Sequence, residues 1–194
     1  EECDKLIELG KMFGYERSSE TSQNRDGTLD GDLISTSRTS TNTWCDDDCK
    51  SHPLVKQVQE RIATVTGFPV DNSEDLQLLN YQEGQYYKTH HDLIEAHVEA
   101  PSGPRVITVF LYLNEVEEGG GTRFPELAPN APPVTIQPKR GSALFWPSVL
   151  DGDINEVDPW TEHEALPVLK GEKFGANAWL HLRDEQNVEG FECS

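Results

Sequence analysis

The chain has 194 residues, with 35 Asp and Glu against 16 Lys and Arg and a formal net charge of −19. This length suits one domain with a real core, which four Trp, seven Phe and five Tyr can fill, and no apolar run approaches the roughly 18 residues of a membrane-spanning helix. The acidity argues against nucleic acid as a partner and favours a neutral or basic one, because cations that neutralise phosphates supply most nucleic-acid affinity.

Two helices are predicted in the first 70 residues, with a polar stretch between them. Apolar residues recur at helical spacing over Cys3–Phe13, whereas residues 18–32 are almost wholly polar and predict a surface loop. Ser51 then supplies a capping hydroxyl and Pro53 a first-turn proline for a second helix. An apolar stripe follows over Leu54–Val65, so this helix is expected to support the core.

The cysteines form an even set, Cys3, Cys45, Cys49 and Cys193, which permits three pairings. We expect a disulfide between Cys45 and Cys49, and a second between Cys3 and Cys193 that would join the two ends of the chain. The alternative for the first pair is a zinc site that includes His52, although a fourth ligand is missing nearby. Disulfides indicate an oxidising compartment.

From residue 76 onward the sequence changes to short runs of β-type residues separated by Gly and Pro, which is typical of a sandwich or jelly roll. The predicted strands are Leu76–Gln82, Tyr86–Leu93, Val106–Leu113, Val134–Gln137, Ser142–Trp146, His163–Leu169 and Lys173–Leu182. The sequence therefore predicts a mainly β fold with supporting helices on one side and a double-stranded β-helix (jelly-roll) core. We expect a single domain over residues 1–194, with a helical and loop part at 1–70 and the jelly-roll core at 71–183.

The densest polar cluster is Lys88-Thr89-His90-His91-Asp92, inside one of the predicted strands. Because side chains alternate along a strand, His90 and Asp92 share a face and His91 points the other way. Such a pair can bind one cation, and a third ligand would leave half an octahedron open, as in non-haem Fe(II) oxygenases. Taken alone, the pair also suits a solvent-exposed strand. The candidates for a third ligand are His52, His97, His163 and His181, of which His163 begins a strand-like segment that could return beside the pair.

The segment from Tyr81 to Asp92 resembles the Tyr-x-x-Gly-Gln-x-Tyr-x-x-His-x-Asp motif of prolyl 4-hydroxylases, which are Fe(II)/2-oxoglutarate dioxygenases. Further motifs resemble the same family in the same order, and together they span residues 35 to 182. They are Arg38-Thr39-Ser40, Arg105 with Leu111-Tyr112-Leu113-Asn114, Gly119-Gly120-Gly121-Thr122-Arg123-Phe124-Pro125, and His163 with Pro167-Val168, Gly171, Lys173, Asn177 and Trp179.

The resemblance implies an enzyme of the procollagen-proline 4-dioxygenase type, which hydroxylates peptidyl proline at C4 with Fe(II), O2 and 2-oxoglutarate and releases succinate and CO2. It implies that His90, Asp92 and His163 bind the metal and that Lys173 pairs with the C5 carboxylate of 2-oxoglutarate, so that these four residues form the catalytic set. It further implies that the cosubstrate is hydrogen-bonded by Tyr81 and Thr122, and that the peptide groove is lined by Tyr87, Arg105 and Trp179.

The same resemblance implies that ascorbate sustains the reduced iron and that the substrate is a proline-rich peptide or protein. Together with the cysteine usage, it implies the endoplasmic reticulum lumen or the secretory pathway. Acidic loops such as 26–32 and 46–48 would attract a basic proline-rich chain. Two alternatives remain open: the same dioxygenase chemistry on lysine or another substrate, and a catalytically silent peptide-binding module on this scaffold.

Overall fold

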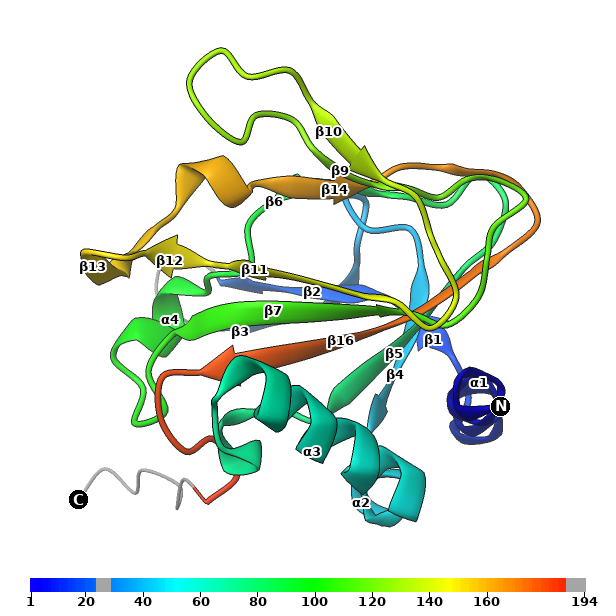
Figure 1. Cartoon of the computed structure of the whole chain (residues 1–194), viewed down its shortest axis with the longest axis horizontal. Coiled ribbons are helices and arrows are strands. Elements are labelled where there is room, and N and C mark those ends of the chain that lie inside the picture. Colours follow the sequence, from blue (N-terminus) through cyan, green and yellow to red (C-terminus); the bar gives the residue numbers. More distant parts are fainter. Residues whose placement is uncertain (24–28, 188–194) are drawn as a thin grey trace.

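Two antiparallel sheets form the centre of the molecule, in a computed structural model that describes residues 1–23 and 29–187. The larger sheet has the strand order β1-β4-β5-β16-β7-β11 and the smaller sheet the order β10-β9-β14-β6. Figure 1 shows the two sheets as separate layers, in the manner of a jelly roll. Within the described parts of the chain, no helix has the length and apolar character needed to cross a membrane. The predicted fold class, mainly β with a jelly-roll core, is confirmed.

The strands of the larger sheet are β1 (Glu16–Arg17), β4 (Thr41–Cys45), β5 (Leu76–Tyr81), β16 (Lys173–His181), β7 (Arg105–Tyr112) and β11 (Ala143–Pro147). Those of the smaller sheet are β10 (Val134–Ile136), β9 (Thr122–Phe124), β14 (His163–Ala165) and β6 (Tyr87–His90). Three further strand pairs are β2 (Ser19–Gln23) with β3 (Leu29–Ile34), β8 (Glu118–Gly119) with β15 (Val168–Lys170), and β12 (Val149–Leu150) with β13 (Asp153–Val157).

The helices cover one face of the larger sheet, as Figure 1 shows for α1 (Glu2–Phe13), α2 (Asp47–Ser51) and α3 (Pro53–Thr66). The principal core cluster joins Leu6 of α1 and Val55 of α3 to Leu78 and Ala176 of the sheet. Every residue of β5 is buried, because the helices cover one face of this strand and the smaller sheet lies over the other. The short elements α4 (Glu95–Val98), η1 (Val70–Asn72) and η2 (Pro159–Thr161) lie in connections between strands.

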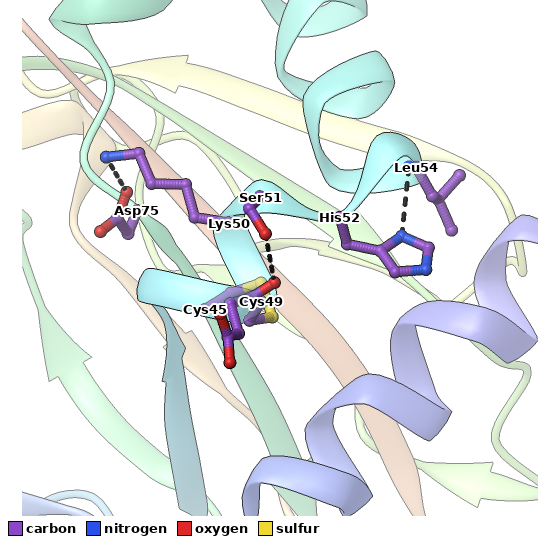
Figure 2. The surroundings of a disulfide bond; sticks show 8 residues. Cys45, Cys49, Lys50, Ser51, His52, Leu54 and Asp75 are labelled. Carbon is purple, nitrogen blue, oxygen red and sulfur yellow. Dashed lines mark hydrogen bonds and ion pairs between the residues drawn. A yellow bond between two sulfur atoms is a disulfide. The ribbon is translucent and has the colours of Figure 1, made fainter.

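Helix α3 begins where the sequence predicts, but its cap is one residue later than Ser51. The ring Nδ1 of His52 accepts a 3.2 Å hydrogen bond from the backbone N–H of Leu54, whereas Ser51 ends α2 and its hydroxyl donates to the carbonyl of Asp48 (Figure 2). Proline disfavours helical geometry in the residue before it, so Pro53 makes His52 the extended residue that occupies the cap.

A disulfide joins Cys45, at the end of β4, to Cys49 in α2, and both residues are fully buried (Figure 2). The zinc alternative is not supported, because the two sulfurs are bonded to each other and His52 caps a helix. Beside the disulfide, Lys50 Nζ forms a 2.9 Å ion pair with Asp75 Oδ1. The second predicted pairing involves Cys193, which lies outside the described residues.

Several boundaries differ from the predictions for physical reasons. The polar stretch predicted as a loop instead forms the hairpin of β2 and β3, since strand pairing needs only main-chain donors and acceptors; residues 24–28 lie outside the described residues. The strand predicted over His163–Leu169 divides into β14 and β15 at Leu166-Pro167, where the proline has no N–H to donate. The strand predicted over Tyr86–Leu93 ends at His90.

Candidate active site

The pairing of two strands of the smaller sheet brings two of the candidate histidines together. β14 runs antiparallel to β6, and His163 lies directly opposite His90 in the register. The centroids of the two rings are 4.3 Å apart. Directly opposed residues on antiparallel strands have their side chains on the same face of the sheet, so both rings face one space.

Asp92 joins this pair from the turn that follows β6. Its Oδ1 lies 3.8 Å from Nε2 of His90, and its Oδ2 lies 3.5 Å from Nε2 of His163. One potential ligand atom from each of the three residues lies within 4.8 Å of the others. A turn, rather than a continued strand, therefore places the carboxylate beside the imidazoles, while the adjacent His91 is exposed and outside the cluster.

Backbone carbonyls orient both rings of this cluster. Nδ1 of His90 lies 2.7 Å from the carbonyl oxygen of Lys88, and Nδ1 of His163 lies 3.0 Å from that of Thr161. An Nδ1–H that donates to a carbonyl leaves Nε2 with its lone pair directed at the cluster, which is the usual arrangement of a metal-binding histidine.

The charge states of the cluster suit a cation. Burial, assisted by the neighbouring His163, lowers the pKa of His90 to about 4, so this ring is neutral at neutral pH. Burial alone would raise the pKa of Asp92, but the two histidines and the Thr108 hydroxyl lower it below its ordinary value. Two imidazoles and one ionised carboxylate form the donor set of the non-haem iron triad.

Aromatic side chains enclose the cluster on the side of His163. The Trp146 ring lies 4.5 Å from the His163 ring in an edge-on arrangement, and the Phe124 ring lies 5.8 Å from it. Trp146 and Phe124 are themselves buried. This wall keeps part of the site away from water, which strengthens electrostatic interactions within it.

A buried lysine lies on the larger sheet, facing the same cavity. Lys173, at the start of β16, is opposite Tyr81 of β5 and is only 1% exposed. Its Nζ lies 5.3 Å from the centroid of the Tyr81 ring, 5.0 Å from that of Phe110 and 5.6 Å from that of Tyr112. Among the described residues, Nζ has no hydrogen-bond partner, and burial lowers the pKa of Lys173 to about 7.

Two further groups complete the surroundings of Lys173. Thr122 of β9 is buried, and its hydroxyl accepts a 2.7 Å hydrogen bond from the Tyr112 hydroxyl. Gly175 makes room for Phe110, since a Cβ at this position would lie only 2.4 Å from Cζ of the phenylalanine ring. The amine of Lys173 therefore lies among the rings of Tyr81, Phe110 and Tyr112, and it bonds to no carboxylate among the described residues.

The residues expected to bind peptide have distinct partners. The Tyr87 ring stacks on the His90 ring, with centroids 3.6 Å apart and planes inclined by 18°. The Arg105 guanidinium lies 3.9 Å from the centroid of the Trp179 ring. All nine sequence-predicted site residues line one cavity of about 780 Å³, including the metal-binding candidates, Lys173 and these three side chains.

A second cluster of two histidines and a carboxylate is made by Glu74, His97 and His181, and its carboxylate is bound by Arg105. Its chemistry differs, because Arg105 donates to both Glu74 oxygens at 2.5 and 2.8 Å, and His181 Nε2 lies 2.8 Å from one of them. Those oxygens are already occupied by cationic partners. Of the two sets, only the one at His90 has a carboxylate that lacks an arginine partner among the described residues.

Sequence reasoning missed several residues that hold the site in place. Thr108 bonds Asp92, Tyr112 bonds Thr122, and Glu74 bonds Arg105. Thr108 and Tyr112 share one face of β7 by strand periodicity, but most residues on both faces of this strand are buried, so burial does not single out the face that meets the site. Glu74 precedes β5 in a polar segment, and no sequence signal marks its pairing with Arg105.

These observations fit an iron-bound 2-oxoglutarate. The two imidazoles and the carboxylate suit a divalent metal. The Lys173 amine, which has no partner among the described residues, suits an anion, since an isolated charge in an apolar site is costly. Lysine acts as a point charge that matches a terminal carboxylate.

Comparisons with known proteins agree with this chemistry. Residues 76–181 match the family model described as the 2OG-Fe(II) oxygenase superfamily, where 2OG denotes 2-oxoglutarate. Prolyl 4-hydroxylase 2 of Arabidopsis thaliana is 34% identical over 93% of this chain and 63% of its own length. The human prolyl 4-hydroxylase subunit alpha-1 is 36% identical over 70% of this chain and 25% of its own length. The chain thus spans less than two thirds of either relative.

A solved structure shares the fold. The 2OG complex of the viral collagen prolyl hydroxylase from Paramecium Bursaria Chlorella virus-1 superposes with a TM-score of 0.69 and 29% identity, covering 93% of this chain and 89% of that one. The family model covers more than half of the chain and includes every one of the nine site residues. The chain therefore belongs to the 2OG-Fe(II) oxygenase superfamily, and its relatives within that superfamily are prolyl 4-hydroxylases.

Proposed function

We propose that this chain hydroxylates peptidyl proline at C4, using Fe(II), O2 and 2-oxoglutarate and releasing succinate and CO2. The observation that carries the proposal is the cavity in which a cluster of two histidines and an aspartate faces a buried lysine that has no partner among the described residues. The similarity to prolyl 4-hydroxylases supports proline as the target.

In this proposal, His90, Asp92 and His163 hold Fe(II) through two Nε2 atoms and a carboxylate oxygen. The carbonyls of Lys88 and Thr161 keep the rings turned toward the metal position by accepting from Nδ1. Bound Fe(II) supplies the activation of O2 that is coupled to decarboxylation of 2-oxoglutarate. The protein contributes orientation and a partly dry site, in which Trp146 and Phe124 shield one side.

Lys173 binds the C5 carboxylate of 2-oxoglutarate, with Tyr81 and Thr122 as further hydrogen-bonding groups. Its amine is held among the rings of Tyr81, Phe110 and Tyr112, and Lys173 lines the same cavity as the metal cluster. An arriving carboxylate would satisfy the buried charge and restore the ordinary protonation of the amine. The buried amine of Lys173 therefore favours an anionic cosubstrate over a neutral one.

Tyr87, Arg105 and Trp179 line the part of the cavity that receives the peptide. Tyr87 packs on a candidate metal ligand, so it lies next to the reacting carbon of a bound proline. Arg105 supplies donors for backbone carbonyls, and the Trp179 ring gives an apolar surface. These groups suit an extended proline-rich chain, whose polyproline II backbone is preformed and offers unpaired carbonyls.

The deciding experiment incubates the protein with Fe(II), 2-oxoglutarate, ascorbate and a proline-rich peptide. We expect a mass gain of one oxygen atom per turnover on proline, assigned to C4 by hydrolysis and comparison with authentic 4-hydroxyproline, together with an equal amount of succinate. His163→Ala should abolish both products while retaining the circular dichroism spectrum. His91→Ala is the matched control for metal binding: this exposed imidazole lines the cavity but lies outside the cluster, so its loss should leave Fe(II) affinity unchanged.

The alternatives predict different results in the same assay. Turnover of lysine peptides or free amino acids in the absence of proline turnover would assign the same chemistry to another substrate. Peptide binding without succinate release would identify a silent binding module. Full activity of His163→Ala would show that another residue is the third ligand.

Two finer features belong to this proposal. Ascorbate keeps the iron reduced between turnovers, so its omission should cause activity to decay within an assay that begins normally.

The buried Cys45–Cys49 disulfide supports residence in an oxidising compartment such as the endoplasmic reticulum lumen or the secretory pathway.

A further inference from the structure

Strand β11 forms one border of the larger sheet. Its single strand neighbour among the described residues is β7, as Figure 1 shows. In the register of the two strands, Ser142 accepts a main-chain hydrogen bond from β7 and Ser148 donates one to it. Hydrogen-bonded positions alternate along an antiparallel strand, so Ala143 and Phe145 direct their N–H and C=O groups away from β7. Such an open edge is a template for pairing with another strand.

The side chains at this edge are apolar and exposed. Phe145 is 57% exposed, and Val65, near the end of α3, is 65% exposed. Both line a second cavity, of about 170 Å³, which lies on the helix-covered side of the sheet together with the exposed Ala143. Its other apolar walls are Leu6, Val58, Ile62, Val109 and Leu111. An apolar surface of this kind marks a site where another molecule binds.

The edge is uncharged within a strongly acidic chain. Residues 141–150 contain no Asp, Glu, Lys or Arg, although the formal net charge of the chain is −19. Lys139 and Arg140 come directly before this run, and Asp151 and Asp153 follow it. If two copies of the run approach each other antiparallel, the basic end of each comes beside the acidic end of the other. The edge is thus complementary in charge to itself, whereas the net charges of two copies repel elsewhere.

An antiparallel pairing of two copies, centred on Leu144, satisfies the open main-chain groups. Ala143 of each copy then lies opposite Phe145 of the other, and each opposed pair exchanges both of its N–H···O=C hydrogen bonds. The small side chain of Ala143 leaves room for the phenylalanine ring, which comes to lie at the mouth of the 170 Å³ cavity. Pro147 has no N–H to contribute, so the pairing ends before it.

We propose that this chain forms a two-fold symmetric dimer through β11. The larger sheets of the two copies join into one continuous sheet, and Phe145 of each copy covers the second cavity of the other. A second copy fits this edge better than a basic partner does, because the run is uncharged and its flanking charges have both signs in complementary order. Trp146 projects from the opposite face of β11 toward His163, so the dimer contact is separate from the metal cluster.

The first test is the mass of the chain in solution, measured by sedimentation over a series of concentrations. We expect a transition from one copy to two with a micromolar dissociation constant. Phe145→Lys places two ammonium groups in the contact and should raise the dissociation constant by roughly 100-fold. Met12→Lys is the matched control, because Met12 of α1 is 70% exposed and lies outside the second cavity. Circular dichroism checks that both variants fold.

The second test exchanges the charges at the ends of the run. Lys139→Glu should raise the dissociation constant by roughly three- to tenfold, and adding Asp151→Lys in the same chain should restore it. Lys56→Glu is the matched control, because it makes the same change in net charge at an exposed position of α3. An equal effect of Lys139→Glu and Lys56→Glu would overturn the antiparallel order of the two edges.

The third test identifies the strand pairing itself by amide hydrogen exchange, resolved by residue with NMR. The N–H groups of Ala143 and Phe145 should become protected by roughly tenfold or more as the protein concentration rises through the dissociation constant. Those of Leu144 and Trp146 already face β7 and should keep the same protection at every concentration. They are internal controls in the same strand.

Three further results would overturn the dimer. They are a wild type that sediments as a single copy at roughly 100 µM, a dimer that persists unchanged in Phe145→Lys, and a dimer in which the Ala143 and Phe145 amides exchange as in the single copy. None of these measurements uses turnover, so their failure is distinct from a failure of the proposed function.

Discussion

The hydroxyl of Thr108 donates a 2.6 Å hydrogen bond to Oδ2 of Asp92. Thr108 is 1% exposed and lies in the middle of β7, flanked across the sheet by Trp146 and Trp179. Strand β7, which lies between β16 and β11 in the larger sheet, therefore orients a carboxylate carried by the turn after β6. The candidate metal site depends on the packing of both layers.

Removal of this hydrogen bond should weaken the metal site without removing a ligand. Thr108→Val keeps the shape of the side chain but leaves Asp92 without its donor, and we expect Fe(II) affinity to fall by roughly 10- to 100-fold, as is usual for partners of metal ligands. Thr108→Ser restores the hydroxyl and should retain near-normal affinity. Anaerobic titration with Co(II), a spectroscopic substitute for Fe(II), followed by absorption, measures the relative loss of metal affinity. Equal affinity in Thr108→Val and wild type would mean that the turn after β6 fixes Asp92 unaided.

The pH dependence of cosubstrate binding should report on Lys173. Its folded pKa of about 7 lies below the ordinary value of 10.5 because of burial. Below pH 7 the free site already carries the ammonium that a carboxylate requires, whereas above pH 7 a proton must be taken up on binding. The KM for the cosubstrate should therefore rise with pH above 7, by at most about tenfold per unit.

Lys173→Arg provides the matched control for this titration, since its guanidinium remains charged throughout. This variant should bind 2-oxoglutarate with a weaker but pH-independent KM. The peptide KM, measured in parallel, shows whether other groups titrate in the same range. A flat KM for the wild type between pH 7 and the ordinary lysine value would exclude the neutral-lysine form of the free site.

Glu74 should be important for both stability and peptide binding. Burial would raise its pKa, but hydrogen bonds from His181 and Arg105 lower it from 4.5 to about 2. A depressed carboxyl pKa contributes stability above pH 4.5, and this contribution is lost as pH falls through about 2. Glu74→Gln should therefore lower the free energy of unfolding by about 3 kcal/mol at pH 7, with a smaller difference from wild type as the pH falls below 4.5.

The same variant should affect catalysis selectively. Without its carboxylate partner, the Arg105 guanidinium is no longer held on the Trp179 ring, so the peptide KM should rise while the KM for the cosubstrate stays near normal. Steady-state kinetics with each substrate varied in turn separates the two effects. A rise confined to the cosubstrate KM would contradict the placement of Arg105 in the peptide groove.

The sequence predicts the two long helices, most of the strands after residue 76 and the jelly-roll class, because apolar periodicity and proline or glycine boundaries are local signals. It does not predict α2, or that β1 and β4, which lie in the part predicted as helix and loop, join the larger sheet. Ordered motifs predict the site residues, and the structure brings all nine to one cavity. What local patterns could not supply is strand register. Three contacts depend on which residues face one another across strands that are far apart in sequence. They are His163 opposite His90, the hydrogen bond from Thr108 to Asp92, and the Trp44 ring beside the Trp179 ring. The β2–β3 hairpin was missed because a polar composition does not reveal main-chain pairing.

The disulfide between Cys45 and Cys49 should stabilise the fold. Closing the short loop between Cys45 and Cys49 restricts the unfolded chain, and the chain-entropy relation gives a loss of about 2 kcal/mol in the free energy of unfolding when the bond is absent. Cys45→Ala, Cys49→Ala and the double variant should show similar losses in chemical denaturation, because each removes the same bond. Wild type under a reducing agent should approach these values. Two results together would show that the two cysteines are unpaired. The denaturation midpoint of the wild type would be the same with and without reducing agent, and both thiols would react with an alkylating reagent in the unfolded protein.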